Sequence, residues 1–343
     1  MLVSVTRRRG LTALHVTRVR RSRVPARHRT LREQKPALYD DATGGDRFEG
    51  ENSMQVRLKS SQAGRVAGWL AAALSVAGLV LGGVQGPAVA ASDRYLDPIF
   101  SSVRVDKDLV YGRVDHGGGD VERLKLDLYR PSGDTKSNRP VLIFVHGGDS
   151  SVDKGFKRNR MVPKGFAHRG FVAAAINYRD GTNGTSRASQ HDTRAAVRWF
   201  RANADRYRVS PSRIVVMGSS AGGVNVLHVA FNPDDAGSSG HPGFSSKVAA
   251  AISVAGADAE PQHIGTGEPP IAMVHAADDT TVPIAAARAT CEQTKASGNV
   301  CTFFEYAEGG HPPEFLTENL ARITEQSSRF ICRQVLDRVS CRG

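Results

Sequence analysis

The stretch Gly218-Ser219-Ser220-Ala221-Gly222 has residue types that could position a nucleophile. It follows the apolar run Ile214–Met217 and precedes small residues, which predicts a strand, a sharp turn and a helix. Glycines on both sides of Ser220 avoid side-chain clashes in so tight a turn. The pattern therefore predicts a serine nucleophile, with helix amides pointing at an incoming carbonyl group.

A serine hydroxyl needs a base, and histidine is the usual one. His311 lies in Gly309-Gly310-His311-Pro312-Pro313, directly after the apolar run Thr302–Tyr306. The flanking glycines and prolines predict a rigid loop that holds an imidazole above the end of a strand. We predict that His311 is the base.

An acid must orient that imidazole and stabilise its charged form. Asp278 and Asp279 both follow the predicted strand Ile271–His275, so either could serve. We expect the other to cap the loop or the next helix. With either acid, the order serine, acid, histidine along the chain is typical of the α/β-hydrolase architecture.

Two backbone amides are expected to form an oxyanion hole. One is the amide of Ala221, directly after the nucleophile. The other is predicted in His146-Gly147-Gly148-Asp149, which follows the apolar run Val141–Val145, from either Gly147 or Gly148. His146 itself is expected to shape this loop and is given no chemical role.

Short apolar runs alternate with longer amphipathic ones from Leu124 onward. This alternation predicts an α/β fold with a mostly parallel sheet, helices on both faces and one domain over residues 91–343. On Ser189–Tyr207 the apolar residues are expected to face inward and the arginines outward. The predicted strands are Leu124–Tyr129, Val141–Val145, Phe171–Tyr178, the run before Ser220, Val248–Val254, Ile271–His275 and Thr302–Tyr306. The predicted helices are Met161–Arg169, Ser189–Tyr207, Gly222–Phe231, Ile284–Lys295 and Pro313–Leu336.

Together these motifs resemble the α/β-hydrolase superfamily, and within it the secreted carboxylesterases and lipase-like proteins of the His-Gly-Gly type. The resemblance covers roughly Leu124–Pro313, including Leu126–Pro131 and Ile176–Arg179. The family's acid stands in Asp-x-x-Val-Pro, so the resemblance selects Asp279 over Asp278. Many relatives carry a third glycine where this chain has Asp149.

The formal net charge of +12 is concentrated near the amino terminus. Residues 1–70 contain 15 Lys and Arg against 6 Asp and Glu, whereas residues 91–343 contain 31 against 28. The nearly balanced second part argues against a nucleic-acid partner.

Residues 1–53 are basic, lack apolar periodicity and are expected to be a disordered leader or an untranslated extension. Residues 54–90 have the order of a secretory signal peptide: a positive flank, the apolar run 66–84, and small residues for cleavage near Ala90. The alternative is that 66–84 anchors the chain in a membrane. We expect export and cleavage, with no stable membrane insertion afterwards.

All four cysteines, Cys291, Cys301, Cys332 and Cys341, lie near the carboxyl end. An even number downstream of an export signal favours disulfides over metal binding. Short loops favour the pairs Cys291–Cys301 and Cys332–Cys341.

The sequence therefore predicts a secreted serine hydrolase that cleaves short or water-soluble carboxylic esters, free or attached to a polymer, without metal or cofactor. Alternatives on the same triad are polyester depolymerases, feruloyl or acetylxylan-type esterases, and peptidases or amidases. A further alternative is a binding protein on a hydrolase scaffold. The sequence favours no oligomeric state.

Overall fold

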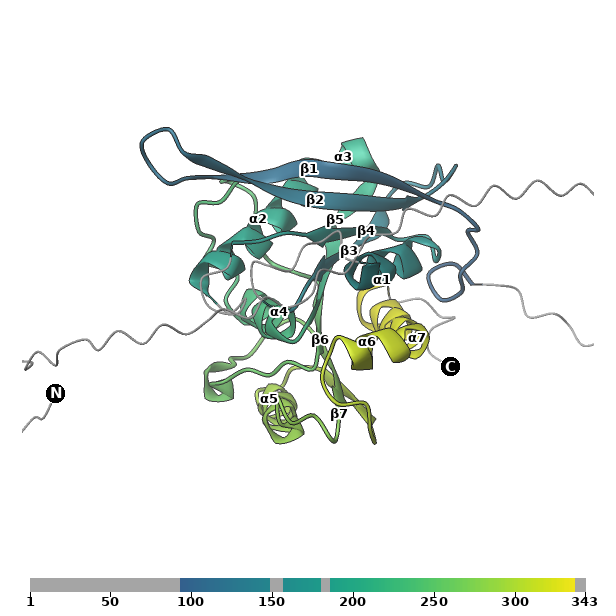
Figure 1. Ribbon diagram of the computed structural model, residues 1–343, viewed down its shortest axis with the longest axis vertical. Coiled ribbons are helices and arrows are strands. Elements are labelled where there is room, and N and C mark those ends of the chain that lie inside the picture. Colours follow the sequence, from purple (N-terminus) through teal and green to yellow (C-terminus); the bar gives the residue numbers. More distant parts are fainter. Residues whose placement is uncertain (1–92, 149–156, 180–185, 337–343) are drawn as a thin grey trace, which may run out of the picture. The chain divides into compact units, whose positions relative to one another are not determined.

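Eight strands form one sheet in the computed structural model, which describes residues 93–148, 157–179 and 186–336 (Figure 1). The strands are β1 (Val103–Asp115), β2 (Val121–Pro131), β3 (Arg139–Val145), β4 (Val172–Ile176), β5 (Val209–Ser219), β6 (Ala250–Val254), β7 (Ile271–Ala276) and β8 (Cys301–Tyr306). Their order across the sheet is β1-β2-β4-β3-β5-β6-β7-β8. β1 and β2 are antiparallel to their neighbours and the other strands are parallel, so the prediction of a mostly parallel sheet is confirmed.

Helices cover both faces of this sheet, as predicted (Figure 1). They are α1 (Lys157–Ala167), α2 (Arg187–Ala202), α3 (Ala204–Tyr207), α4 (Ala221–Phe231), α5 (Ile284–Ala296), α6 (Glu314–Glu318) and α7 (Leu320–Ile331). A 3₁₀ turn (Pro261–His263) and a π-helical turn (Cys332–Leu336) complete the elements.

The central strand β3 shows why the sheet needs two helical layers. Val141, Ile143 and Val145 join a core with α2, α4 and α5, whereas Leu142 and Phe144 join a core with α1, α6 and α7. Successive side chains of a strand point to opposite faces, so a continuously apolar strand must be covered on both.

Three elements differ from the sequence predictions. The sequence predicts no element over residues 103–115, but they form the edge strand β1. A shift in its pairing with β2 between Asp106 and Leu109 interrupts the alternation of outward-facing and inward-facing side chains. The helix predicted over Pro313–Leu336 is broken at Asn319, which separates α6 from α7. The helix predicted over Ser189–Tyr207 ends at Ala202, and α3 follows.

The expectation that all arginines of α2 face outward is wrong. Arg194 and Arg198 are buried, and burial lowers the pKa of Arg194 to about 10. Arg198 donates to the carbonyl oxygens of Ala236 and Gly240 at 2.7 and 2.8 Å, and Arg194 donates to that of His228. Ala236 and Gly240 lie in the segment between α4 and β6, and His228 lies in the last turn of α4, so the two guanidinium groups hold α2 against α4 and the segment that follows it.

The predicted disulfide Cys291–Cys301 is present and joins α5 to the start of β8. The second predicted pair includes Cys341, which lies outside the described residues. The predictions for residues 1–53 and 54–90 also lie outside them. Among the helices that the structure describes, none combines the length and apolar character needed to cross a bilayer.

Candidate active site

Ser220 occupies the turn between β5 and α4, in a backbone conformation that side chains seldom adopt, with φ 53° and ψ −122°. Its amide donates to the carbonyl oxygen of Val254 at 2.8 Å, which ties the turn to β6. A Cβ atom on Gly218 would lie 2.2 Å from the carbonyl oxygen of Gly222. A Cβ atom on Gly222 would lie 2.2 Å from that of Val145, so both flanking glycines are required by direct contact.

His311 lies in the loop between β8 and α6, and its Nε2 atom is 2.7 Å from the Oγ atom of Ser220. On the other side of the ring, Nδ1 lies 2.7 Å from the Oδ2 atom of Asp279. Because a carboxylate only accepts, the Nδ1–H group donates to Asp279 and Nε2 is left to accept the serine hydroxyl proton. The structure thus brings together three predicted residues that are 91 and 32 positions apart in the sequence.

Asp279 follows β7, and its side chain is fully buried. The amides of Thr281 and Val282 donate to its Oδ1 atom at 2.9 and 3.0 Å, so the carboxylate is held by its own turn while Oδ2 faces His311.

Asp278 is exposed and does not contact the imidazole of His311. It accepts the amides of Gly310 at 2.8 Å and Gly309 at 3.2 Å, and these hydrogen bonds lower the pKa of its carboxyl group. Of the two adjacent acids, Asp279 therefore contacts the histidine side chain and Asp278 contacts the backbone of the histidine loop.

Gly147 and Gly148 follow β3 and lie beside the nucleophile. A Cβ atom on Gly147 would stand 2.6 Å from the carbonyl oxygen of Ser219, and Gly148 has a φ of 79°. His146 packs against Tyr178 with ring centroids 4.4 Å apart, and the Tyr178 hydroxyl donates to the His146 carbonyl oxygen. These contacts agree with the prediction that His146 shapes the loop.

Comparisons with known proteins agree with this architecture. Residues 126–258 match the BD-FAE family model. The chain is 27% identical over 227 residues to a probable carboxylic ester hydrolase, LipM, of Mycobacterium tuberculosis, an alignment that covers 54% of this chain and 50% of LipM. It is 32% identical over 124 residues to an isoprenylcysteine alpha-carbonyl methylesterase of Arabidopsis thaliana, covering 36% of this chain and 27% of that protein.

Among solved structures, esterase 2 of Thermogutta terrifontis superposes with a TM-score of 0.56 at 26% identity, covering 66% of this chain and 91% of that chain. Its butyrate-bound form gives a TM-score of 0.58 at 25% identity, covering 66% and 93%. The chain is a member of the α/β-hydrolase superfamily, and its sequence is similar to those of carboxylic ester hydrolases. It spans half or less of the length of the curated relatives that it matches.

A pocket of about 390 Å³ opens beside Ser220 in this α/β-hydrolase. Asn159 of α1 and Leu316 of α6 line it, although neither was predicted as a site residue. No sequence signal distinguishes them, because their positions depend on how two helices from distant parts of the chain pack together. The other lining residues are Gly147, Gly148, Ser219, Ala221, Thr281, His311, Pro312 and Pro313.

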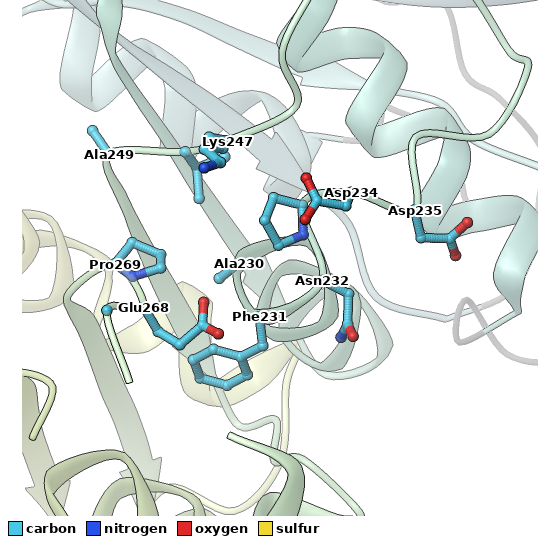
Figure 2. A pocket seen from close by; sticks show the side chains of 12 residues that line it. Ala230, Phe231, Asn232, Asp234, Asp235, Lys247, Ala249, Glu268 and Pro269 are labelled. Atoms are coloured by element: carbon cyan, nitrogen blue, oxygen red, sulfur yellow. The ribbon is translucent and has the colours of Figure 1, made fainter. Parts of the chain in front are cut away.

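A larger pocket, of about 570 Å³, lies where α4 ends and β6 and β7 begin (Figure 2). Ser220 lies at the opposite edge of the sheet, after the carboxyl end of β5. Asp234, Lys247 and Glu268 line the larger pocket, and none of its described lining residues is a serine, cysteine or histidine. Of these two pockets, only the smaller is lined by the predicted serine and histidine. Among the described residues, no group of His, Cys, Asp and Glu is arranged to hold a metal ion. Asp149, where the family resemblance leads us to expect a glycine, lies outside the described residues.

Proposed function

We propose that this protein is a serine esterase that cleaves carboxylic esters through Ser220, His311 and Asp279. The observation that carries the proposal is the continuous hydrogen-bonded chain from the Ser220 hydroxyl through the His311 imidazole to the buried Asp279 carboxylate, with both contacts at 2.7 Å. This arrangement gives the hydroxyl a base and gives the base an oriented counter-charge.

The reaction follows from these positions. His311 Nε2 removes the Ser220 proton as Oγ attacks the ester carbonyl, and Asp279 stabilises the imidazolium that forms. The amide of Ala221, the first residue of α4, and that of Gly147 or Gly148 stabilise the negative oxygen. His311 then protonates the departing alcohol, and a water molecule discharges the acyl-enzyme by the same route.

We further propose that the substrates are short or water-soluble esters, free or polymer-linked, and that the protein is secreted. The modest pocket beside Ser220 supports a short acyl group. Thermogutta esterase 2, a structural relative, has been crystallised with propionate and with butyrate bound. The disulfide Cys291–Cys301 supports export to an oxidising compartment.

Labelling with a fluorophosphonate, followed by mass spectrometry of the labelled peptide, tests the nucleophile. We expect one label, on Ser220, and none in Ser220→Ala. The structural relative from Thermogutta is phosphorylated by paraoxon, so this class of reagent suits the fold. A series of p-nitrophenyl esters of increasing acyl length tests the substrate range, with the highest kcat/KM expected between acetate and butyrate. Label retained in Ser220→Ala would refute the assignment.

A further inference from the structure

A second histidine, His275, contacts the acid of the proposed triad. It lies near the end of β7, four residues before Asp279, and its side chain is fully buried. Its Nε2 atom is 2.8 Å from the carbonyl oxygen of Val282 and 3.3 Å from the Oδ2 atom of Asp279. The same Oδ2 atom accepts the Nδ1–H group of His311, so it lies between two imidazole rings.

The hydrogen-bonding partners determine which nitrogen of His275 carries the proton. Both neighbours of Nε2 are acceptors, so Nε2 must be the donor. Nδ1 is buried and has no hydrogen-bond partner among the described residues. A second proton there would create a buried N–H group without an acceptor. Burial correspondingly lowers the pKa of His275, although the nearby Asp279 carboxylate opposes that change; His311 is the other ionisable group acting on it.

The turn from Asp279 to Val282 is thereby held from two sides. The Val282 amide donates to Asp279 Oδ1, and the Val282 carbonyl accepts from His275. Without His275, the Val282 carbonyl would lose its side-chain donor, and the buried Oδ2 atom of Asp279 would lose a polar neighbour 3.3 Å away. The Asp279 carboxylate could then rotate away from His311.

We propose that His275 is a positioning residue for the triad: its neutral Nε2–H group holds the Asp279–Val282 turn so that Asp279 faces His311. This inference rests on the esterase function proposed above. It adds a residue that acts through Asp279 and contacts neither the substrate nor Ser220.

A pair of substitutions separates this role from simple filling of the core. His275→Gln keeps an N–H donor near the position of Nε2, whereas His275→Leu keeps the volume and removes the donor. We expect His275→Leu to lower kcat at least about tenfold with KM within about twofold, because the Val282 carbonyl loses its donor and the turn that holds the Asp279 carboxylate is no longer fixed. We expect His275→Gln to retain kcat within about threefold of the wild type. If His275 only filled space in the core, His275→Leu should be more active than His275→Gln, since leucine suits an apolar core better than glutamine does.

The wild-type protein offers a measurement that does not depend on a folded variant. Nitrogen-15 NMR of labelled histidines reports the tautomer and charge of each ring. We expect the His275 ring to be neutral and protonated on Nε2 between about pH 6.5 and pH 8, because burial lowers its pKa below the ordinary value of 6.5. A proton on Nδ1 instead, or a ring that becomes charged within that range, would overturn the inference.

The outcomes also separate the two proposals. If the wild type hydrolyses no ester and fluorophosphonate does not label Ser220, the esterase function and the role of His275 both fail. If labelling and hydrolysis succeed but His275→Leu matches the wild type or exceeds His275→Gln, only the role of His275 fails.

Discussion

Asn substitutions at the adjacent residues Asp278 and Asp279 should have very different effects on activity. In Asp279→Asn, the amides of Thr281 and Val282 require the amide oxygen at the position of Oδ1. The new NH₂ group must then occupy the position of Oδ2, which faces Nδ1 of His311 at 2.7 Å.

An NH₂ group there donates to Nδ1 and leaves the imidazole proton on Nε2. In that tautomer His311 points a proton at Ser220 and cannot remove one. We expect kcat/KM to fall about 10⁴-fold, the loss typical of a triad histidine held in the wrong tautomer. Asp278→Asn keeps the acceptor for Gly310 and loses only the longer, exposed bond to Gly309, so kcat/KM should stay within about fivefold.

The assay is hydrolysis of p-nitrophenyl butyrate at one fixed, mildly alkaline pH, with rates normalised to the amount of protein shown to be folded by its thermal unfolding midpoint. Asp278→Asn is the matched control, since it removes the same charge one residue away. The tautomer argument fails if Asp279→Asn retains more than about a tenth of wild-type activity or if Asp278→Asn is the more damaging change.

Three further predictions concern stability and selectivity. Gly218→Ala should lower the free energy of unfolding by about 2–4 kcal/mol. The control Gly265→Ala, whose Cβ would meet only Glu268 Oε1 at 3.7 Å, should change it by less than about 0.5 kcal/mol. Equal urea unfolding midpoints for the two variants would contradict this prediction. Replacing Cys291 and Cys301 together by serine should cost about 2–3 kcal/mol, measured by denaturant unfolding, and an unchanged midpoint would show that the ten-residue loop needs no disulfide. Leu316→Ala enlarges the pocket beside Ser220, so the kcat/KM ratio of hexanoate to acetate esters should rise about tenfold; an unchanged ratio would mean that Leu316 does not limit acyl length.

The stability should also depend on pH through Asp134. Burial alone would raise the pKa of this carboxyl group, but hydrogen bonds from Arg94 and the Lys136 amide outweigh it and leave the pKa lowered. A depressed pKa in the folded state stabilises the protein above the unfolded pKa, and this stabilisation disappears as the pH falls through the folded value. We therefore expect Asp134→Asn to flatten the decline in unfolding midpoint below about pH 4. An unchanged decline would show that the Arg94–Asp134 pair contributes nothing to acid stability.

Much of the fold could be predicted because its signals are local. β3, β7 and the second half of β5 are short, mostly apolar runs that are buried throughout, and such runs identify strands covered on both faces. Where the local signal is irregular, prediction failed. In β1, register shifts interrupt the alternation of inward-facing and outward-facing side chains. The break between α6 and α7 at Asn319 occurs without a proline or glycine.

Buried charge was also beyond prediction from the sequence. Arg194 and Arg198 have the residue type of a solvated helix face, yet they are buried, because carbonyl groups of α4 and of the segment between α4 and β6 accept their hydrogen bonds. Those acceptors lie 34 to 42 residues away, so no periodicity within α2 could reveal them.

The sequence by itself determined the types of the reacting groups and their local settings: a serine between glycines in a turn, a histidine in a loop of glycines and prolines, and acids after a strand. Such settings depend on backbone conformation, which neighbouring residues control. Only the tertiary structure decided that Asp279 contacts the imidazole while Asp278 contacts its loop, that His275 lies against the acid, and that Asn159 and Leu316 line the pocket. Hydrogen bonds act only within about 3 Å, and the distances that decide these partners arise from packing between segments far apart in the chain.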